Sequence, residues 1–207
     1  MNRRLPPLIF LAAAALSACA GGPRPEFEDR FDAAPAAGWT WLRENPGAWR
    51  VQDGALEIRI DTGNAETVRN VLVRPAPDRR AGKWAIEVTL TSLAEPTKQY
   101  EQGGITWYQG GKPGFKLVKE LVNGTVMIVP GHVPMAAKTV QFRLVLEGEA
   151  YTALFRPGAA GEWLTAGSGK LPPPGVDDQM SLQCYNGPPD AEHWIRFDDF
   201  RVWRLAE

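Results

Sequence analysis

The sequence predicts an all-β protein in which residues 27–207 fold as one two-sheet antiparallel sandwich. Short runs of alternating apolar and polar residues recur along the chain, and a period of two is typical of strands with one buried face. Glycine, proline and asparagine interrupt these runs, and no long segment holds the 3.6-residue period of a helix. Roughly a dozen short strands joined by such turns indicate a sandwich or barrel.

Residues 1–18 predict a signal peptide. Arg3 and Arg4 form a basic start, and the apolar run 8–16 that follows is too short for a stable transmembrane helix. The run ends in Leu-Ser-Ala-Cys, with the cysteine at position 19, and this sequence resembles the lipobox of bacterial lipoproteins. The resemblance implies that Cys19 is lipidated and becomes the mature N-terminus. An ordinary signal peptide with a chance cysteine is the alternative.

A lipobox implies that the mature protein is anchored in the bacterial cell envelope. Residues 19–26 would form a short tether containing glycine and proline between the lipid and the fold. Several acyl chains make a durable membrane anchor, whereas a single chain binds marginally. Ala20 stands where a signal for retention in the inner membrane would more typically place Asp, so we expect delivery to the outer membrane.

Three runs show the alternation of a half-buried strand most clearly. They are residues 56–60, 86–90 and 140–146, each with an apolar side chain at every second position. Glu147-Gly148 follows the third run and predicts a hairpin turn.

The sharpest local signal is Asn123-Gly124. It lies between the β-rich run 116–122 and a second run that begins at Thr125, and both turn positions of a two-residue hairpin need positive φ. A two-residue loop would pair Val122 with Thr125.

Composition excludes several classes of function. The net charge is −1, so the chain lacks the basic surface that nucleic-acid binding requires. Two cysteines and two histidines leave no disulfide scaffold and no four-thiolate zinc site. With Cys19 lipidated, Cys184 would be a lone thiol, which we expect to be buried.

Five motifs in a fixed order carry a resemblance to known domains. They occupy residues 38–49, 52–58, 101–108, 115–120 and 197–203. In this order they resemble concanavalin A-like, laminin G-like jelly-roll domains. The closest likeness is to the family named for "regulation of enolase protein 1", followed by the C-terminal sandwich of family-43 glycoside hydrolases. The resemblance covers most of the chain and implies a jelly roll whose concave front sheet frequently binds carbohydrate.

A carbohydrate cleft typically places an aromatic platform beside polar side chains that bond to hydroxyl groups. Strand alternation and the resemblance nominate eight residues for such a face: Gln102, Thr106, Tyr108, Lys116, Glu120, Gln183, Tyr185 and Trp194. The chain has eight tryptophans, of which Trp39 and Trp41 are further candidates for the ligand face. Trp107 lies two residues from Ile105, on the same side of the strand, so we expect it in the core. For Lys116 and Glu120, a plain ion pair on a solvated face is an equal alternative.

The sequence contains no motif that predicts catalysis. Glycoside hydrolysis needs two carboxylates across the scissile bond, and jelly-roll glucanases carry Glu-x-Asp-x-x-Glu on one strand. Here Glu101 and Glu120 are single acids on different strands, and His132 and His193 complete no convincing Ser-His-Asp set. We therefore expect a non-catalytic domain, with a hydrolase that uses non-standard acids as an alternative.

Jelly rolls of the class that the chain resembles often hold one structural calcium between the first and last strands. Calcium takes oxygen ligands only, and the matching positions are Glu28, the carbonyl of Gly54, and Asp198. The alternative is that these acids cap turns or pair with Arg30 and Arg201.

Together these features predict a lipid-anchored envelope protein whose sandwich binds carbohydrate or another envelope polymer. The main alternative is a structural lipoprotein that holds a protein partner. A polar cleft floored by aromatic side chains would favour sugar, whereas a flat apolar patch would favour protein.

Overall fold

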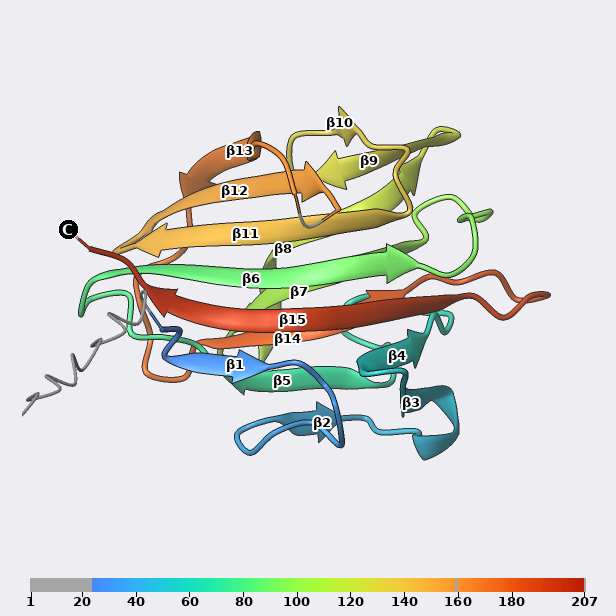
Figure 1. Ribbon diagram of the computed structural model, residues 1–207, viewed down its shortest axis with the longest axis horizontal. Helices are drawn as coiled ribbons and strands as arrows, with labels where there is room; N and C mark the ends of the chain where they lie inside the picture. Colours follow the sequence, from blue (N-terminus) through green and yellow to red (C-terminus); the bar gives the residue numbers. More distant parts are fainter. Residues whose placement is uncertain (1–23, 159, 207) are drawn as a thin grey trace, which may run out of the picture.

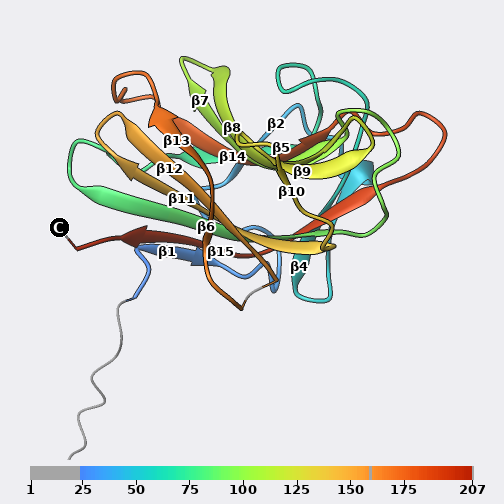
Figure 2. The ribbon, with the colours of Figure 1, turned by 90° about the horizontal axis from the view of Figure 1, so that it is seen from above.

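The computed structural model describes residues 24–158 and 160–206, and over these ranges it consists of two antiparallel sheets packed face to face (Figures 1 and 2). The predicted all-β sandwich is therefore confirmed. The predicted signal peptide and Cys19 lie outside the described residues. Within the described part of the chain, no helix has the length and hydrophobicity that crossing a membrane requires.

The larger sheet, which we call the back sheet, has eight strands. In spatial order they are β13 (Leu164–Lys170), β12 (Ala150–Pro157), β11 (Thr139–Glu147), β6 (Lys83–Ser92), β15 (Trp194–Arg204), β4 (Ala55–Arg59) and β3 (Trp49–Gln52), with β1 (Phe27–Asp29) also paired to β15. A register shift between Asp198 and Arg201 divides β15, so that β4 pairs with its first part and β1 with its second.

The second sheet, which we call the front sheet, has seven strands. In spatial order they are β10 (Val133–Pro134), β9 (Thr125–Val129), β8 (Lys112–Val122), β7 (Gln102–Gln109), β14 (Gln179–Tyr185), β5 (Val71–Pro75) and β2 (Thr40–Leu42). Figure 2 shows β7, β8 and β14 in one layer and β6, β11 and β15 in the other. Strands from distant parts of the sequence therefore meet in the middle of each sheet.

The local predictions agree with the observed elements. The three alternating runs form β4, β6 and β11. Val122 pairs with Thr125 across the predicted hairpin, and Asn123 and Gly124 have φ values of 50° and 78°. Positive φ at both positions is what a two-residue hairpin turn requires, so the register predicted for β8 and β9 is confirmed.

The core lies between the two sheets and contains the inward side chain of every second strand residue. Trp107 is 1% exposed, as its phase predicts, and Cys184 is fully buried, which raises the pKa of its thiol. Trp41 and Trp49 pack against this core with their ring centroids 4.8 Å apart. Trp39 also packs there, and its indole nitrogen donates to Asp29 Oδ2 at 3.0 Å. Trp39 and Trp41 therefore act as packing groups at the edge of the sandwich.

Candidate functional site

Seven of the eight predicted ligand residues share the outer face of the front sheet. Alternation brings this about, because Trp107, Leu117 and Leu182 are buried in the core and their strand neighbours therefore face outward. Strand pairing then aligns the seven across three adjacent strands: Gln102, Thr106 and Tyr108 on β7, Lys116 and Glu120 on β8, and Gln183 and Tyr185 on β14.

Trp194 does not lie with the other seven. It begins β15 in the back sheet, where the guanidinium carbon of Arg50 lies 4.3 Å from its ring centroid. Ile195 and Phe197 are buried in the core, so the phase of β15 directs Trp194 to the outer face of the back sheet. Alternation predicts the side of a strand on which a residue lies, but it does not predict the sheet to which the strand belongs.

Lys116, Gln102 and Glu120 form a closed set of hydrogen bonds, which we call the Lys116 triad. Lys116 Nζ donates to Gln102 Oε1 at 2.8 Å and to the two Glu120 carboxylate oxygens at 3.2 and 3.1 Å. Gln102 Nε2 donates to Glu120 Oε1 at 2.7 Å. The Glu120 side chain is 6% exposed, whereas the Lys116 side chain remains 34% exposed. The predicted ion pair therefore exists, and it presents the lysine to solvent in a fixed position.

Tyr108, Gln183 and Thr106 form a second hydrogen-bonded set beneath a loop. Tyr108 Oη lies 2.8 Å from both Gln183 Oε1 and the carbonyl oxygen of Ala65, and Gln183 Nε2 donates to Thr106 Oγ1 at 2.9 Å. All three side chains are almost fully buried, and burial raises the pKa of Tyr108. Tyr108 and Gln183 thus fix the loop against the sheet and are not placed to contact a ligand.

A groove runs over β7 and β8 on this face. It consists of two adjoining cavities of about 490 and 230 Å³, which share Ala65, Pro113, Lys116 and Tyr185 in their walls. We call it the front groove. Its other lining residues are Asn64, Glu66, Tyr100, Gln102, Thr106, Gly114, Phe115 and Glu120. Small-molecule sites are typically about 300–1,000 Å³, so the front groove is large enough for a ligand.

The aromatic side chains that line the front groove are Phe115 and two tyrosines. Tyr185 lies in the sheet and is 7% exposed, and its pKa is raised, mainly by burial. Tyr100 is 52% exposed and has a φ of +65°, a rare conformation for a bulky residue. Sequence reasoning missed Tyr100, although continuing the alternation of β7 by one step before Gln102 would have nominated it.

Of the three predicted calcium ligands, Glu28 is already engaged by two arginines. Glu28 accepts from Arg201 Nε at 2.8 Å and from Arg30 Nε at 3.2 Å, and the Arg201 hydrogen bond lowers its pKa. Two guanidinium groups at this carboxylate are a poor environment for a divalent cation, so Glu28 does not fit. Asp198 Oδ1 accepts from its neighbour's backbone N–H at 2.6 Å. Among the residues that the structure describes, no three acidic, histidine or cysteine side chains cluster as metal ligands.

Comparisons with known proteins identify the fold. No family model matches the chain, and no curated protein matches it. The GH43 protein BlXynB from Bacillus licheniformis is similar in structure, with a TM-score of 0.67 and 16% identity over 86% of this chain and 39% of that one. GH43B of the Bacteroides ovatus xyloglucan PUL has a TM-score of 0.66 and 18% identity over 89% of this chain and 40% of that one.

An alginate lyase from Klebsiella pneumoniae shares the fold as well. Its TM-score is 0.56 at 11% identity, over 79% of this chain and 86% of that one. The chain spans only about two fifths of the length of the two GH43 proteins. These similarities support the prediction that the chain shares its fold with a part of GH43 proteins. The resemblance to the "regulation of enolase protein 1" family stays a prediction.

Proposed function

We propose that the front groove binds a carbohydrate and that the protein is a non-catalytic binding module. The observation that carries this proposal is the exposed Tyr100 ring beside the fixed Lys116 triad in one groove. An aromatic ring offers a platform to the C–H face of a sugar, and the polar groups can bond to its hydroxyl rim. The same surface is a groove with charged and amide groups in its wall, unlike the flat apolar face that would favour a protein partner.

The charges of the groove favour a neutral glycan. Lys116 is the cation that lines it, and Glu120 already pairs with this lysine at 3.1 Å. Glu66 adds a further carboxylate to the wall, so a polyuronate would meet no excess of positive charge. The triad is held in place before any ligand arrives, which lowers the entropic cost of binding.

Binding without cleavage agrees with the placement of the acids. Hydrolysis of a glycoside needs one carboxyl group as acid and a second as base or nucleophile. Glu120 is occupied by Lys116 and Gln102, and Glu66 lies on the exposed loop at the rim. The structural neighbours are described as GH43 proteins and an alginate lyase, which supports a function related to carbohydrate for this fold.

We also propose that a lipid on Cys19 holds this module at the bacterial envelope, on the outer membrane. The support is the lipobox pattern in the sequence. Metabolic labelling with a radioactive fatty acid tests it: the wild type should be labelled and partition into the membrane fraction, and Cys19→Ala should do neither. Equal labelling of both proteins would contradict the proposal.

Isothermal titration with a panel of neutral and acidic oligosaccharides tests the groove. We expect saturable binding of at least one neutral glycan, weakened about 3- to 10-fold by Tyr100→Ala because the stacking platform is lost. Leu164→Ala is the matched control, since Leu164 is 47% exposed against 52% for Tyr100 and lies on β13 of the back sheet, outside the lining of the groove. No binding of any saccharide, or equal affinity in Tyr100→Ala, would contradict the proposal.

A further inference from the structure

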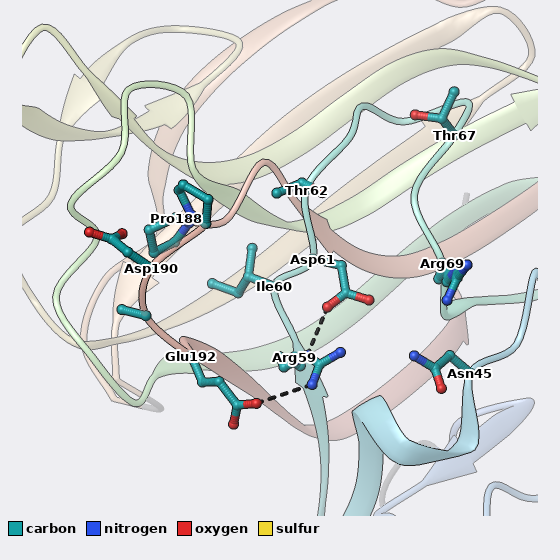
Figure 3. Close-up of a pocket in the computed structure, with 12 residues that line it drawn as sticks. Asn45, Arg59, Ile60, Asp61, Thr62, Thr67, Arg69, Pro188, Asp190 and Glu192 are labelled. Atoms are coloured by element: carbon teal, nitrogen blue, oxygen red, sulfur yellow. Dashed lines mark hydrogen bonds and ion pairs between the residues drawn. The ribbon is translucent and has the colours of Figure 1, made fainter.

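A second cavity, of about 610 Å³, opens at one end of the sandwich, and we call it the end pocket (Figure 3). The loop after β4 separates it from the front groove. Residues 64–66 of this loop line the front groove, whereas Thr62, Thr67 and Arg69 line the end pocket. The other wall is the loop 188–192, which begins with two prolines. The two hollows are therefore distinct, although they share one loop.

The centre of the end pocket is fixed by ion pairs. Arg59 Nε donates to Asp61 Oδ1 at 2.8 Å, and Arg59 Nη1 donates to Glu192 Oε1 at 3.1 Å (Figure 3). Asp61 is the second residue after β4 and Glu192 the second before β15, so Arg59 joins the two walls of the pocket. The hydrogen bond to Asp61 raises the pKa of Arg59, which keeps the guanidinium charged.

Asn45 and Arg69 also line the cavity, and neither side chain has a hydrogen-bond partner in the described part of the chain. They lie across the cavity from Pro188 and Asp190 (Figure 3). The backbone that carries them is held: the Asn45 N–H donates to the Asn70 side chain at 2.7 Å, and the Asn70 amide donates to the carbonyl of Ala48 at 3.3 Å. The side chains of Asn45 and Arg69 can therefore bond to a ligand, and hydrogen bonds hold the backbone beside them in place.

The lining indicates the chemistry of a ligand. The lining contains two arginines, Arg59 and Arg69, and three acidic residues, Asp61, Asp190 and Glu192, so neither an anion nor a cation gains from a strong field of opposite charge. The lining contains no aromatic side chain, so stacking cannot hold the ligand. Planar guanidinium, carboxylate and amide groups suit a molecule that both donates and accepts hydrogen bonds at adjacent positions.

We propose that the end pocket is a second carbohydrate-binding site, which binds a neutral sugar only through hydrogen bonds to its hydroxyl groups. Vicinal hydroxyl groups both donate and accept, as the mixed lining requires. This inference does not depend on the front groove binding sugar. It adds a site in which sequence reasoning nominated no residue.

Chemical-shift mapping on the isotope-labelled full chain, in a phosphocholine detergent that carries no sugar, tests the proposal. Glucose, galactose and xylose are the neutral probes, and glucuronate and inorganic phosphate are the anionic ones. We expect at least one neutral sugar to shift the amides of Thr62, Arg69 and Ala191 saturably. Arg69→Ala should weaken this binding at least about tenfold, since a hydrogen bond to a charged group is lost. Arg80→Ala, another exposed arginine, should leave it unchanged.

The same spectra separate the two sites. Shifts at the end pocket that persist in Tyr100→Ala support a second site, whatever happens in the front groove. Shifts confined to Thr106 and Lys116 would overturn the inference and leave the proposed function standing. A response to phosphate or glucuronate alone would show an anion site and overturn it, as would the absence of any shift at the end pocket.

Discussion

Tyr100 adopts a backbone conformation that is rare for a bulky residue. Its φ of +65° is disfavoured for a side chain with a Cβ, and such conformations cost on the order of 1–3 kcal/mol. The surrounding bonds enforce it, because the Tyr100 N–H donates to the carbonyl of Leu121 at 2.7 Å and its own carbonyl accepts from Gln102 Nε2 at 2.8 Å. The result is an exposed ring at the rim of the front groove, where a ligand can use it.

Asp198 is a carboxyl group that the folded state disfavours in its charged form. Burial raises its pKa, and the nearby Asp199 and Asp32 raise it further. A raised carboxyl pKa means that the stability contribution is fully present at low pH and is lost as pH rises through the folded-state pKa. We expect Asp198→Asn to match the wild type in acid and to be the more stable protein at neutral pH, as urea unfolding at several pH values would show.

The same variant tests the predicted calcium. If a calcium ion occupied Asp198, the substitution would destabilise the protein in calcium buffer, and a chelator would lower the melting temperature of the wild type only. Equal melting of the wild type with calcium and with chelator would argue against a bound ion.

At the residue scale, strand alternation predicted which side chains share a face, and it did so for seven of the eight nominated positions. It could not predict that Tyr108 and Gln183 would be covered, because the covering carbonyl of Ala65 belongs to a loop distant in sequence. Nor could it predict the end pocket, whose walls come from three separate segments of the chain.

At the element scale, β7 depends on Gly104. Its φ is +155°, and a Cβ there would lie 2.3 Å from the carbonyl oxygen of Leu117 on β8. We expect Gly104→Ala to destabilise the fold by about 1–3 kcal/mol, since backbone atoms of the paired strand must move. Gly114 lies on β8, and a Cβ added to it would have nothing within 4 Å, so Gly114→Ala is the control. Denaturant unfolding of both variants measures the difference, and equal stability would contradict the expectation.

At the scale of the whole molecule, Arg79 joins three connections at one end of the sandwich. Its side chain is fully buried and donates to the carbonyls of Gly148 and Pro172 at 2.7 and 3.0 Å and to Asp178 Oδ2 at 2.8 Å. Removing one partner of a buried pair typically costs about 3–5 kcal/mol, because the other charge stays buried. We expect Arg79→Met to lower the unfolding free energy by that amount.

Arg80→Met is the control for the loss of the buried Arg79 contacts. Arg80 pairs with Asp78 on the surface, where both side chains are about half exposed, and such pairs contribute little. If thermal and urea unfolding show similar losses of unfolding free energy in the two variants, the buried contacts of Arg79 contribute no more than a surface ion pair.

Lys119 links the two sheets and makes the stability of the whole fold depend on pH. It is buried on β8, and its Nζ donates to Ser92 Oγ of β6 at 3.2 Å and to the carbonyls of Ala137 and Lys138 at 2.7 and 3.1 Å. Burial lowers the pKa of Lys119 to about 8, against the partly offsetting charge of Glu95. The unfolded chain keeps its proton up to the ordinary lysine pKa of about 10.4, so between these values the unfolded state binds more protons than the folded state.

Stability should therefore rise with pH across that window, by at most about 1.4 kcal/mol per pH unit for this one group. Lys119→Met should remove this contribution to the slope. It should also lower stability at neutral pH, because the Ala137 carbonyl loses this donor and the Lys138 carbonyl keeps only the Ser92 N–H. Urea unfolding of both proteins between pH 7 and about pH 10 measures the difference between the two slopes, which cancels the titration of the tyrosines. Identical slopes would mean that the three hydrogen bonds keep Lys119 charged in the folded protein, and that burial does not control its titration.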